Sequence, residues 1–403
     1  MGETAKPLAG IRVVEFGTLI AGPFCTRILA EFGAEVIKIE APGEGDPLRA
    51  WRKLHQGTSL WWYVQARNKK SLTLNLKHPE ALAVARRLAA GADIVVENFR
   101  PGVMEKFGLG WADLAADNPG LVMVRLSGFG QSGPMREQGG FGAVAESMGG
   151  LRYVTGYPDR PPVKTGVSIG DSIAALWGAV GALMALRHRD ATGGRGRGQG
   201  QVVDVALYEA VFAMMESLVP EFGTAGFVRE RTGNVMPGIT PSNTHTTRDG
   251  RHIIVGGNGD AIFKRLMAAI GRPDLAADPQ LAGNAGRDAR AAEIYAVIDA
   301  WVGGHDAESA LRILAEAQVP ASAIFSVADI FANPQYLARG MIESWRLPDG
   351  TEIKLPGIVP KLSETPGGTE WLGPALGEHS DAVLAELGYG EADIARLRRA
   401  GAV

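Results

Sequence analysis

One acidic side chain, Asp171, stands directly behind Gly170 and just before an uncharged apolar run, Ile173 to Leu186. The run predicts a buried helix that packs closely through its alanines and glycines. Asp171 then falls at the start of that helix, where the helix dipole and the free backbone N–H groups favour a negative charge. A carboxylate held there can act as a nucleophile on an activated acyl group. It needs no general base, because a carboxyl group is already ionised at neutral pH.

The alternative role of Asp171 is a helix N-cap, for which Asp is among the best residues. Two features favour the chemical role. Gly166 and Gly170 leave the backbone bare, so a large ligand can approach closely. The helix behind is buried, which places the carboxylate at the edge of the core. The apolar run is shorter than the ~18–20 residues that a bilayer-spanning helix needs.

Other reactive groups are sparse. The seven histidines are scattered and are expected to be solvated or capping residues, so no Ser-His-Asp arrangement is predicted. Cys25 is the only cysteine, which excludes an intrachain disulfide, and no metal site is predicted. Gly128, Gly130 and Gly133 form a G-x-G-x-x-G pattern, but Pro134 follows where a dinucleotide fingerprint requires a helix. A nicotinamide site is therefore rejected.

Length and composition indicate an ordinary soluble protein. A chain of 403 residues is long for one core, so two domains are expected. Hydrophobic residues make up 46% and charged residues 21%, and the net charge of −3 offers no basic surface for nucleic acid. The N-terminus shows neither a signal peptide nor a myristoylation motif. We expect a cytoplasmic protein with no membrane partner.

Strands and helices alternate over the first part of the chain, which predicts an α/β fold with a parallel sheet covered on both faces. Strands are expected at 11–16, 35–40, 71–76, 93–97, 121–126 and 202–205, and helices at 23–32, 79–90, 111–118 and 208–218. Ligands of such sheets bind beyond the carboxyl ends of the strands. The loops expected there are 17–23, 98–102 and 127–133.

The second half of the chain has a different pattern. Residues 223–242 are rich in Gly and Pro and predict a linker. A smaller α+β domain is expected from strands at 252–256 and 320–325 and helices at 261–270, 291–301 and 307–317. Short strands at 342–346 and 352–355 and helices at 380–386 and 391–399 are expected to close the chain.

Eight segments occur in one order along almost the whole chain. They are PLAGIRVVEFG (7–17), AGPFCTRILAEFGAEVIKIE (21–40), RNKKSLTLNLK (67–77), VVENFRPGVMEKFGLG (95–110), SGFGQSGP (127–134), GDSIAAL (170–176), GRGQGQVVDVALYEAV (196–211) and LGEHSDAVLAELG (376–388). With these segments the chain resembles the class III coenzyme A transferases, the family of formyl-CoA transferase and carnitine CoA-transferase. In that family the Asp of the Gly-Asp pair is the catalytic nucleophile, and it corresponds to Asp171.

The resemblance implies a fold and an assembly. It implies a large Rossmann-like domain with its N-terminal part at 1–222, a linker and small domain at 223–332, and a C-terminal part at 333–403 that returns to the large domain. Each subunit would then form a ring, and two rings would interlock into a homodimer. Residue spacing alone does not show this.

The resemblance also implies an activity. Asp171 would carry CoA from an acyl-CoA donor to a small carboxylic acid by ping-pong transfer, through aspartyl anhydrides and an aspartyl-CoA thioester. CoA would be a substrate, and no permanently bound cofactor is expected. Succinyl-CoA with a short dicarboxylate is the favoured pair, because many relatives use it.

The family's CoA-binding loops correspond to several stretches of this chain. They are Leu19, Ile20 and Ala21; Leu74, Asn75, Leu76 and Lys77; Asn98, Phe99 and Arg100; Lys106; and Gln138, Gly139, Gly140 and Phe141. Lys106 replaces a family Arg and so loses the planar fork. Two other family cations are Ala41 and Gly139 here, and Arg136 is a candidate substitute for the second. The alternative for each lone Lys or Arg is a solvated charge.

Glu146 stands where the family commonly has Gln, and it is assigned to the substrate site. If it lies close to Asp171, like-charge repulsion raises a pKa of the pair; the alternative is an exposed helix residue. Two other functions compete with transfer. A 2-methylacyl-CoA racemase needs a His in a Gly-His-Asp segment, but the matching segment is Gly140-Phe141-Gly142. A non-catalytic CoA-binding protein would have no use for Asp171 in its full motif.

Overall fold

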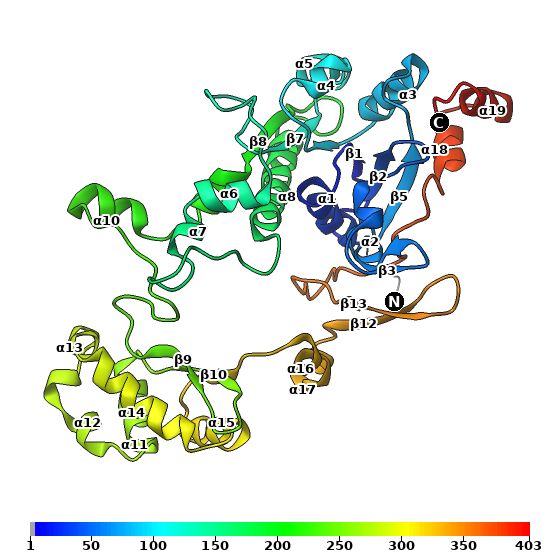
Figure 1. Cartoon of the computed structure of the whole chain (residues 1–403). Helices are drawn as coiled ribbons and strands as arrows, with labels where there is room; N and C mark the ends of the chain where they lie inside the picture. Colours follow the sequence, from blue (N-terminus) through cyan, green and yellow to red (C-terminus); the bar gives the residue numbers. More distant parts are fainter. Residues whose placement is uncertain (1–4) are drawn as a thin grey trace. The chain divides into compact units, whose positions relative to one another are not determined.

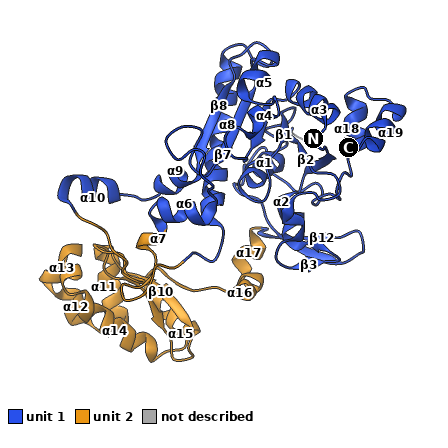
Figure 2. Ribbon diagram, turned by 45° about the horizontal axis from the view of Figure 1, so that its top comes forward, with its two compact units in different colours: residues 1–151, 164–226, 340–403 blue, residues 152–163, 227–339 orange. Residues whose placement is uncertain are grey.

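The computed structural model describes residues 5–403 in two compact units (Figures 1 and 2). Unit 1 comprises residues 1–151, 164–226 and 340–403, and unit 2 comprises residues 152–163 and 227–339. The expectation about N-terminal targeting falls partly on residues 1–4, which lie outside the described residues. The domain boundaries expected at residues 222 and 332 stay predictions.

Unit 1 is built on a six-stranded sheet in the order β5-β2-β1-β6-β7-β8. All five neighbouring pairs are parallel, which confirms the predicted α/β fold with a parallel sheet. The strands are β1 (Arg12–Glu15), β2 (Glu35–Glu40), β5 (Lys69–Thr73), β6 (Ile94–Glu97), β7 (Val122–Ser127) and β8 (Gln201–Ala206). Strand β5 begins and ends earlier than expected, so Leu74 to Lys77 follow the strand as a loop.

Helices cover both faces of the sheet because successive strand residues point to opposite sides. Val13 of β1 belongs to the core beneath α1 (Ala21–Glu31) and α8 (Ile169–Ala191). Val14 belongs to the opposite core, beneath α3 (Pro79–Ala90), α18 (Ser380–Glu386) and α19 (Glu391–Arg399). The two C-terminal helices thus pack on the sheet beside α3, far from them in sequence (Figure 1).

Helix α8 is longer than the apolar run that predicted it, and Asp171 is not its N-cap. The cap position is Ser168, and Asp171 lies in the first turn. By length and apolar composition alone the 23-residue helix qualifies to cross a membrane, with 44% of its most apolar window buried in the protein. Its small residues pack against β7, β8 and α1. The expectation of no membrane partner stays a prediction.

The remaining elements of unit 1 are short. The helix expected at 208–218 is wrong, since the chain leaves the helix after Phe212 and begins another at Leu218. The elements are η1 (Pro47–Ala50), β3 (Leu54–His55), β4 (Thr58–Ser59), α2 (Leu60–Gln65), α4 (Val103–Lys106), α5 (Trp111–Asp117), α6 (Gly142–Met148), α9 (Leu207–Phe212), α10 (Leu218–Ala225), β12 (Ile342–Arg346) and β13 (Glu352–Pro356). Helix α7 (Leu151–Val154) spans the boundary between the units.

Unit 2 is a small α+β unit with an antiparallel sheet in the order β11-β10-β9. Its core gathers Ile253 and Val255 of the central strand with Phe263, Leu266 and Leu314 of the helices. Strand β9 begins at the end of the stretch predicted as a linker. The elements are β9 (Ser242–Thr246), β10 (His252–Gly256), α11 (Asp260–Ala269), α12 (Pro273–Ala277), η2 (Pro279–Leu281), α13 (Asn284–Ala289), α14 (Ala291–Gly303), α15 (Ala307–Glu316), β11 (Ala321–Ala323), α16 (Val327–Ala332) and α17 (Pro334–Ala338).

Candidate active site

A cavity of about 550 Å³ opens at the carboxyl end of the parallel sheet in unit 1. The loops after β1, β6 and β7 line it, together with α6 and the first turn of α8. Strands β1 and β6 are neighbours at the point where the chain order of the sheet reverses. Open α/β sheets bind their ligands at such a point. The loop positions that the sequence predicted as a ligand site therefore meet around one cavity.

Asp171 lines this cavity and is partly buried. Burial, and next the negative charge of Glu146, raise the pKa of Asp171 to about 6. A backbone hydrogen bond from Gly142 and the charge of Lys164 act in the opposite direction. With a pKa of about 6 the carboxylate is still mostly ionised at neutral pH, so it keeps its nucleophilic form.

Two glycines, Gly142 and Gly170, leave the space that the side chain of Asp171 and the backbone near it occupy. A Cβ on Gly142, the first residue of α6, would collide with Asp171 Oδ2. A Cβ on Gly170 would lie 2.8 Å from the carbonyl oxygen of Gly142 and 3.3 Å from Glu146 Cγ. Helices α6 and α8 can therefore approach each other so closely only because both positions lack a side chain. The same approach brings buried Glu146 close to Asp171, and both side chains line the cavity.

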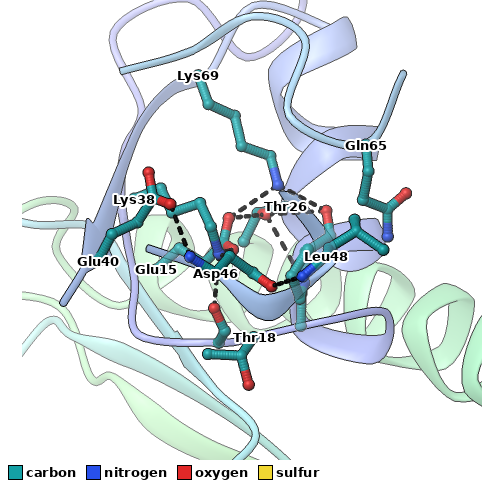
Figure 3. Close-up of polar contacts among 12 residues, drawn as sticks. Glu15, Thr18, Thr26, Lys38, Glu40, Asp46, Leu48, Gln65 and Lys69 are labelled. Atoms are coloured by element: carbon teal, nitrogen blue, oxygen red, sulfur yellow. Dashed lines mark hydrogen bonds and ion pairs between the residues drawn. The ribbon is translucent and has the colours of Figure 1, made fainter. Parts of the chain in front are cut away.

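Three buried side chains hold the segment from Gly17 to Pro23, which comprises the loop after β1 and the first turn of α1. Figure 3 shows these side chains, Lys38, Asp46 and Lys69. Lys38 Nζ donates to the carbonyl oxygen of Gly17 at 2.7 Å, and Lys69 Nζ donates to that of Pro23 at 2.7 Å. Between them, the backbone N–H of Leu19 donates to both carboxylate oxygens of Asp46, at 3.0 and 3.1 Å. Leu19 has a φ of 64°, which is unfavourable for a residue with a side chain. The carboxylate thus stabilises the conformation that presents this loop to the cavity.

The charges that fasten the loop form one buried network around Glu15. Glu15 pairs with Lys38 at 2.6 Å and with Lys69 at 2.8 Å, and Thr26 Oγ1 donates to it. Lys38 pairs in addition with Asp46 at 2.8 Å. Burial alone would raise the pKa of Glu15, but the two lysines lower it to about 2. These residues are fully enclosed, so their charges serve the scaffold and not a ligand.

The two lysines respond differently to the same glutamate. Burial lowers the pKa of Lys69 to about 8 despite the charge of Glu15. The pKa of Lys38 is raised, because there the charges of Glu15, Asp46 and Glu40 outweigh the effect of burial. We take the ion pair of each lysine with Glu15 as formed, since both Nζ atoms lie within 2.8 Å of its carboxylate.

Further contacts join the cavity's loops to one another. Thr18 and Asn98 exchange two hydrogen bonds, from Thr18 N to Asn98 Oδ1 at 2.8 Å and from Asn98 Nδ2 to Thr18 O at 2.9 Å. On the other side, a Cβ on Gly128 would lie 2.6 Å from Gly140 Cα. Gly128, the first glycine of the pattern after β7, therefore allows two backbone segments to pack closely.

A second cavity, of about 630 Å³, adjoins the first, because Thr18 and Phe99 line both. The loops after β2 and β5 form its walls, and its lining includes Ala41. Lys77 is the cation among its lining residues. One long ligand could therefore extend from the loop after β5 to Asp171.

Most predicted site residues surround these two cavities. Leu19, Ile20, Ala21, Asn98, Phe99, Arg100, Gln138, Gly140, Phe141, Glu146 and Asp171 line the first. Leu74, Asn75, Leu76 and Lys77 line the second. Gly139 lies against the guanidinium of Arg100, where a Cβ would be 2.9 Å from Nη2. Lys106 is exposed at the end of α4 and lines neither cavity.

Sequence reasoning missed several residues of the first cavity, above all Trp51, Arg52, Lys164 and Ser168. Trp51 and Arg52 follow η1, in a stretch with no periodic pattern. The adjacent aromatic and cationic side chains were the only available signal. Within residues 5–403, no group of three His, Cys, Asp or Glu side chains could hold a metal ion.

Comparisons with known proteins find relatives that are similar in sequence and in fold. The family model described as CoA-transferase family III matches residues 8–380. A succinyl-CoA–D-citramalate CoA-transferase of Chloroflexus aurantiacus is 49% identical over 98% of this chain and 97% of its own. The alpha subunit of a succinyl-CoA–L-malate CoA-transferase of the same organism is 41% identical over 98% of this chain and 92% of its own. A crystal structure of a CAIB/BAIF family protein from Brucella suis superposes with a TM-score of 0.83 at 34% identity, over 95% of this chain and 100% of the other.

Proposed function

Because the chain belongs to CoA-transferase family III and is thus an enzyme that transfers CoA, we propose that it uses Asp171 to move CoA from succinyl-CoA to a short dicarboxylic acid. The choice of substrates is supported by relatives named for succinyl-CoA with citramalate and with malate, which match nearly the whole chain. Both acceptors are hydroxylated dicarboxylic acids with a four-carbon main chain, and citramalate carries a methyl branch in addition. An acceptor of this class is the best candidate.

The proposed reaction consists of four acyl substitutions. Asp171 attacks the thioester carbon of succinyl-CoA, the C–S bond breaks, and CoA leaves as a thiolate while a mixed anhydride forms. The thiolate attacks the acyl carbon of Asp171, which releases succinate and leaves an aspartyl-CoA thioester. The acceptor carboxylate attacks that thioester and displaces the thiolate again. The thiolate then attacks the acceptor's acyl carbon, which gives the new acyl-CoA and restores the Asp171 carboxylate.

The observation that carries this proposal is the position of Asp171, a mostly ionised carboxylate in the first turn of α8 that lines a cavity. We propose that the thiol arm of CoA lies in this first cavity, between the loops at Leu19 and Phe99. The nucleotide end would then occupy the second cavity, with Lys77 facing its phosphates. The predicted contact between Lys106 and CoA stays a prediction, since Lys106 lines neither cavity.

We also propose that the protein is an interlocked homodimer, as the resemblance implies. An exposed apolar stripe along α8 supports a further subunit contact: Leu176, Trp177, Val180, Leu183 and Met184 are all exposed in the single chain. Interlocked chains cannot separate without opening, so a folded monomer on dilution in analytical ultracentrifugation would argue against it. The cytoplasmic location stays a prediction.

The test of function is a transfer assay with succinyl-CoA and a panel of carboxylic acids. We expect new acyl-CoA to form with four- and five-carbon dicarboxylates and none to form when the acceptor is omitted. Absence of transfer with every acid, or equal transfer to monocarboxylates, would contradict the proposal.

The same preparation separates transfer from racemisation. A racemase needs an acid and a base on opposite faces of the carbon next to the thioester. Phe141 lines the cavity and Gly142 touches Asp171, and neither can carry a proton. Glu146 also lines the cavity and can carry a proton, but for racemisation it would have to reach the face of the carbon opposite to Asp171. Incubation of (2R)-2-methylacyl-CoA in deuterated water without acceptor should give no deuterium at C2. Rapid uptake that depends on Asp171 would favour the racemase.

A further inference from the structure

Arg52 is a charged residue of the first cavity. It has no role in the proposed binding of CoA or in the proposed chemistry of Asp171. It is exposed and lines the same cavity as Asp171. Its guanidinium lies 4.7 Å from the ring centroid of Trp61, which favours one orientation of the planar group. Within residues 5–403, the side chain of Arg52 forms no hydrogen bond or ion pair. A cation that is oriented but has no anionic partner is suited to a ligand.

The backbone of Arg52 supports a functional role. Six non-glycine residues of the described chain have a positive φ, and two of them, Leu19 at 64° and Arg52 at 61°, line this one cavity. Such conformations are unfavourable for residues with side chains, and they gather at ligand sites. At Leu19 the contact with Asp46 explains the strain. At Arg52 the described residues 5–403 provide no such contact with the backbone N–H, and the side chain of Arg52 lines the cavity.

Three cations line the cavity, and the other two have assignments of their own. Arg100 continues the segment of Asn98 and Phe99 and lies against Gly139, among residues predicted to contact CoA. Lys164 acts on Asp171, whose pKa it lowers. A dicarboxylic acyl group has a second, unreacted carboxylate that enters the same cavity with the thioester. Of the three cations, Arg52 therefore remains available to bind this second carboxylate.

We propose that Arg52 binds the free carboxylate of the dicarboxylic acyl group, in the CoA thioester and in the acceptor acid. This rests on the proposed function, since only dicarboxylic substrates carry that group. A guanidinium can bind a carboxylate through two parallel N–H···O bonds. Because stacking on Trp61 already restricts the guanidinium of Arg52, less conformational entropy is lost when the carboxylate binds. Arg52 would thereby select dicarboxylates over monocarboxylates of equal length.

The test measures binding without turnover, in the Asp171→Asn background. Succinyl-CoA and butyryl-CoA have the same number of acyl carbons and differ in the second carboxylate. We expect the background protein to bind succinyl-CoA more tightly. Adding Arg52→Leu should weaken succinyl-CoA binding by roughly 10- to 100-fold and butyryl-CoA binding by less than about threefold. Arg52→Lys should fall between, because it keeps the charge and loses the fork.

Arg100→Leu in the same background is the matched control, since it removes a guanidinium from the same cavity. It should weaken both thioesters alike. Equal binding of the two thioesters before mutation, or a preference for succinyl-CoA that survives Arg52→Leu, would overturn the proposal, as would equal weakening of both. Calorimetric titration gives the affinities, and a melting curve shows that each variant is folded.

The outcome is separable from that of the proposed function. If the wild type transfers no CoA from succinyl-CoA but the binding preference depends on Arg52, the proposed reaction fails and the carboxylate site stands. If transfer between dicarboxylates proceeds and the preference survives Arg52→Leu, the reaction stands and the role of Arg52 is refuted.

Discussion

Glu15 and Asp171 are two acidic residues of unit 1, and their surroundings shift their pKa values in opposite directions. Glu15 ends β1 beneath the loop that lines the cavity, and Asp171 opens into the cavity from α8. Burial raises the pKa of both. At Glu15 the charges of Lys38 and Lys69 reverse that effect and bring the pKa to about 2. At Asp171 the charge of Glu146 adds to it and brings the pKa to about 6.

Burial acts in the same direction on both carboxylates, so the charged partners account for the difference between their pKa values. Glu15 is enclosed and forms ion pairs with the ammonium groups of Lys38 and Lys69, both within 2.8 Å. The two lysines in turn donate hydrogen bonds to the backbone of the segment that lines the cavity. Asp171 has a like charge beside it and an open side, so its ionised form is poorly stabilised and available to an acyl carbon. Substitutions at the two residues should therefore affect different properties.

The largest effect is expected from Asp171→Asn. The amide keeps the shape of the side chain but cannot form the anhydride, so the rate of CoA transfer should fall on the order of 10⁴-fold or more. The melting temperature should stay unchanged or rise, because a partly buried charge next to Glu146 is removed. Initial rates and a melting curve check both halves. Transfer at a rate near that of the wild type would refute Asp171 as the nucleophile.

Glu15→Gln should affect stability before it affects chemistry. Removing the carboxylate leaves Lys38 and Lys69 buried with fewer partners, which should destabilise the protein by about 3–5 kcal/mol. Glu386→Gln is the matched control, because Glu386 also faces two cations, Arg12 and Lys70, but at the surface. There the loss should be about 0–1 kcal/mol. Equal losses in chemical denaturation would mean that the buried network is no more important than a surface one.

The pH dependence of this stability has a definite sign. Because the pKa of Glu15 in the folded protein is lowered to about 2, its contribution is fully present above its ordinary pKa of 4.5. It is lost as the pH falls from there towards 2. The gap between the free energies of unfolding of the wild type and Glu15→Gln should therefore narrow as the pH falls below the ordinary pKa of Glu15. A gap that widens in acid would contradict the ion pairs.

A methyl group at Gly142 should disturb the site without disturbing the scaffold. Gly142→Ala would collide with Asp171 Oδ2, whereas Gly166→Ala adds the same atom in open space. A displacement of about 1 Å at the nucleophile can lower the rate ~10²-fold, so we expect a loss of roughly 10- to 100-fold for Gly142→Ala and none for Gly166→Ala. Similar rates for the two variants would mean that the contact between α6 and α8 does not position Asp171.

The sequence predicts the sheet of unit 1 well because local pattern and turn chemistry determine it. EVIKIE alternates and forms β2, and the loops that the resemblance assigned to CoA line the two cavities. It does not predict the network around Glu15, since the partners of Lys38 come from residues 15, 17 and 46. Because apolar and charged residues alternate in the sequence of β2, this alternation predicts that Lys38 is exposed to solvent. Its burial depends on contacts that no local window contains.

The same limit explains the two clearest errors. The helix expected at 208–218 is broken after Phe212, although Tyr208 to Leu218 is apolar enough for one continuous helix. Trp51 and Arg52 were missed because a single cation in an irregular stretch has no period, and only the folded loop brings it to Asp171. Family resemblance identified Asp171 as the proposed nucleophile, and three-dimensional contacts are needed to find the residues that surround it.

The smallest and most specific effect is expected from Glu146→Gln. Burial is the larger cause of the raised pKa of Asp171 and remains in this variant, while the like charge is removed. The pKa of Asp171 should therefore fall below about 6 but stay above its ordinary value of 3.8. Activity that requires the ionised carboxylate is present above the pKa and is lost as the pH falls through it. The acidic limb of the pH–rate profile should thus move to lower pH, with less than about a twofold change at pH 8, where Asp171 is ionised in both proteins. An unmoved limb would show that the charge of Glu146 does not act on Asp171. A limb moved to higher pH would mean that Glu146 stabilises the ionised nucleophile, and the contrast between Asp171 and Glu15 would then not depend on the sign of the neighbouring charge.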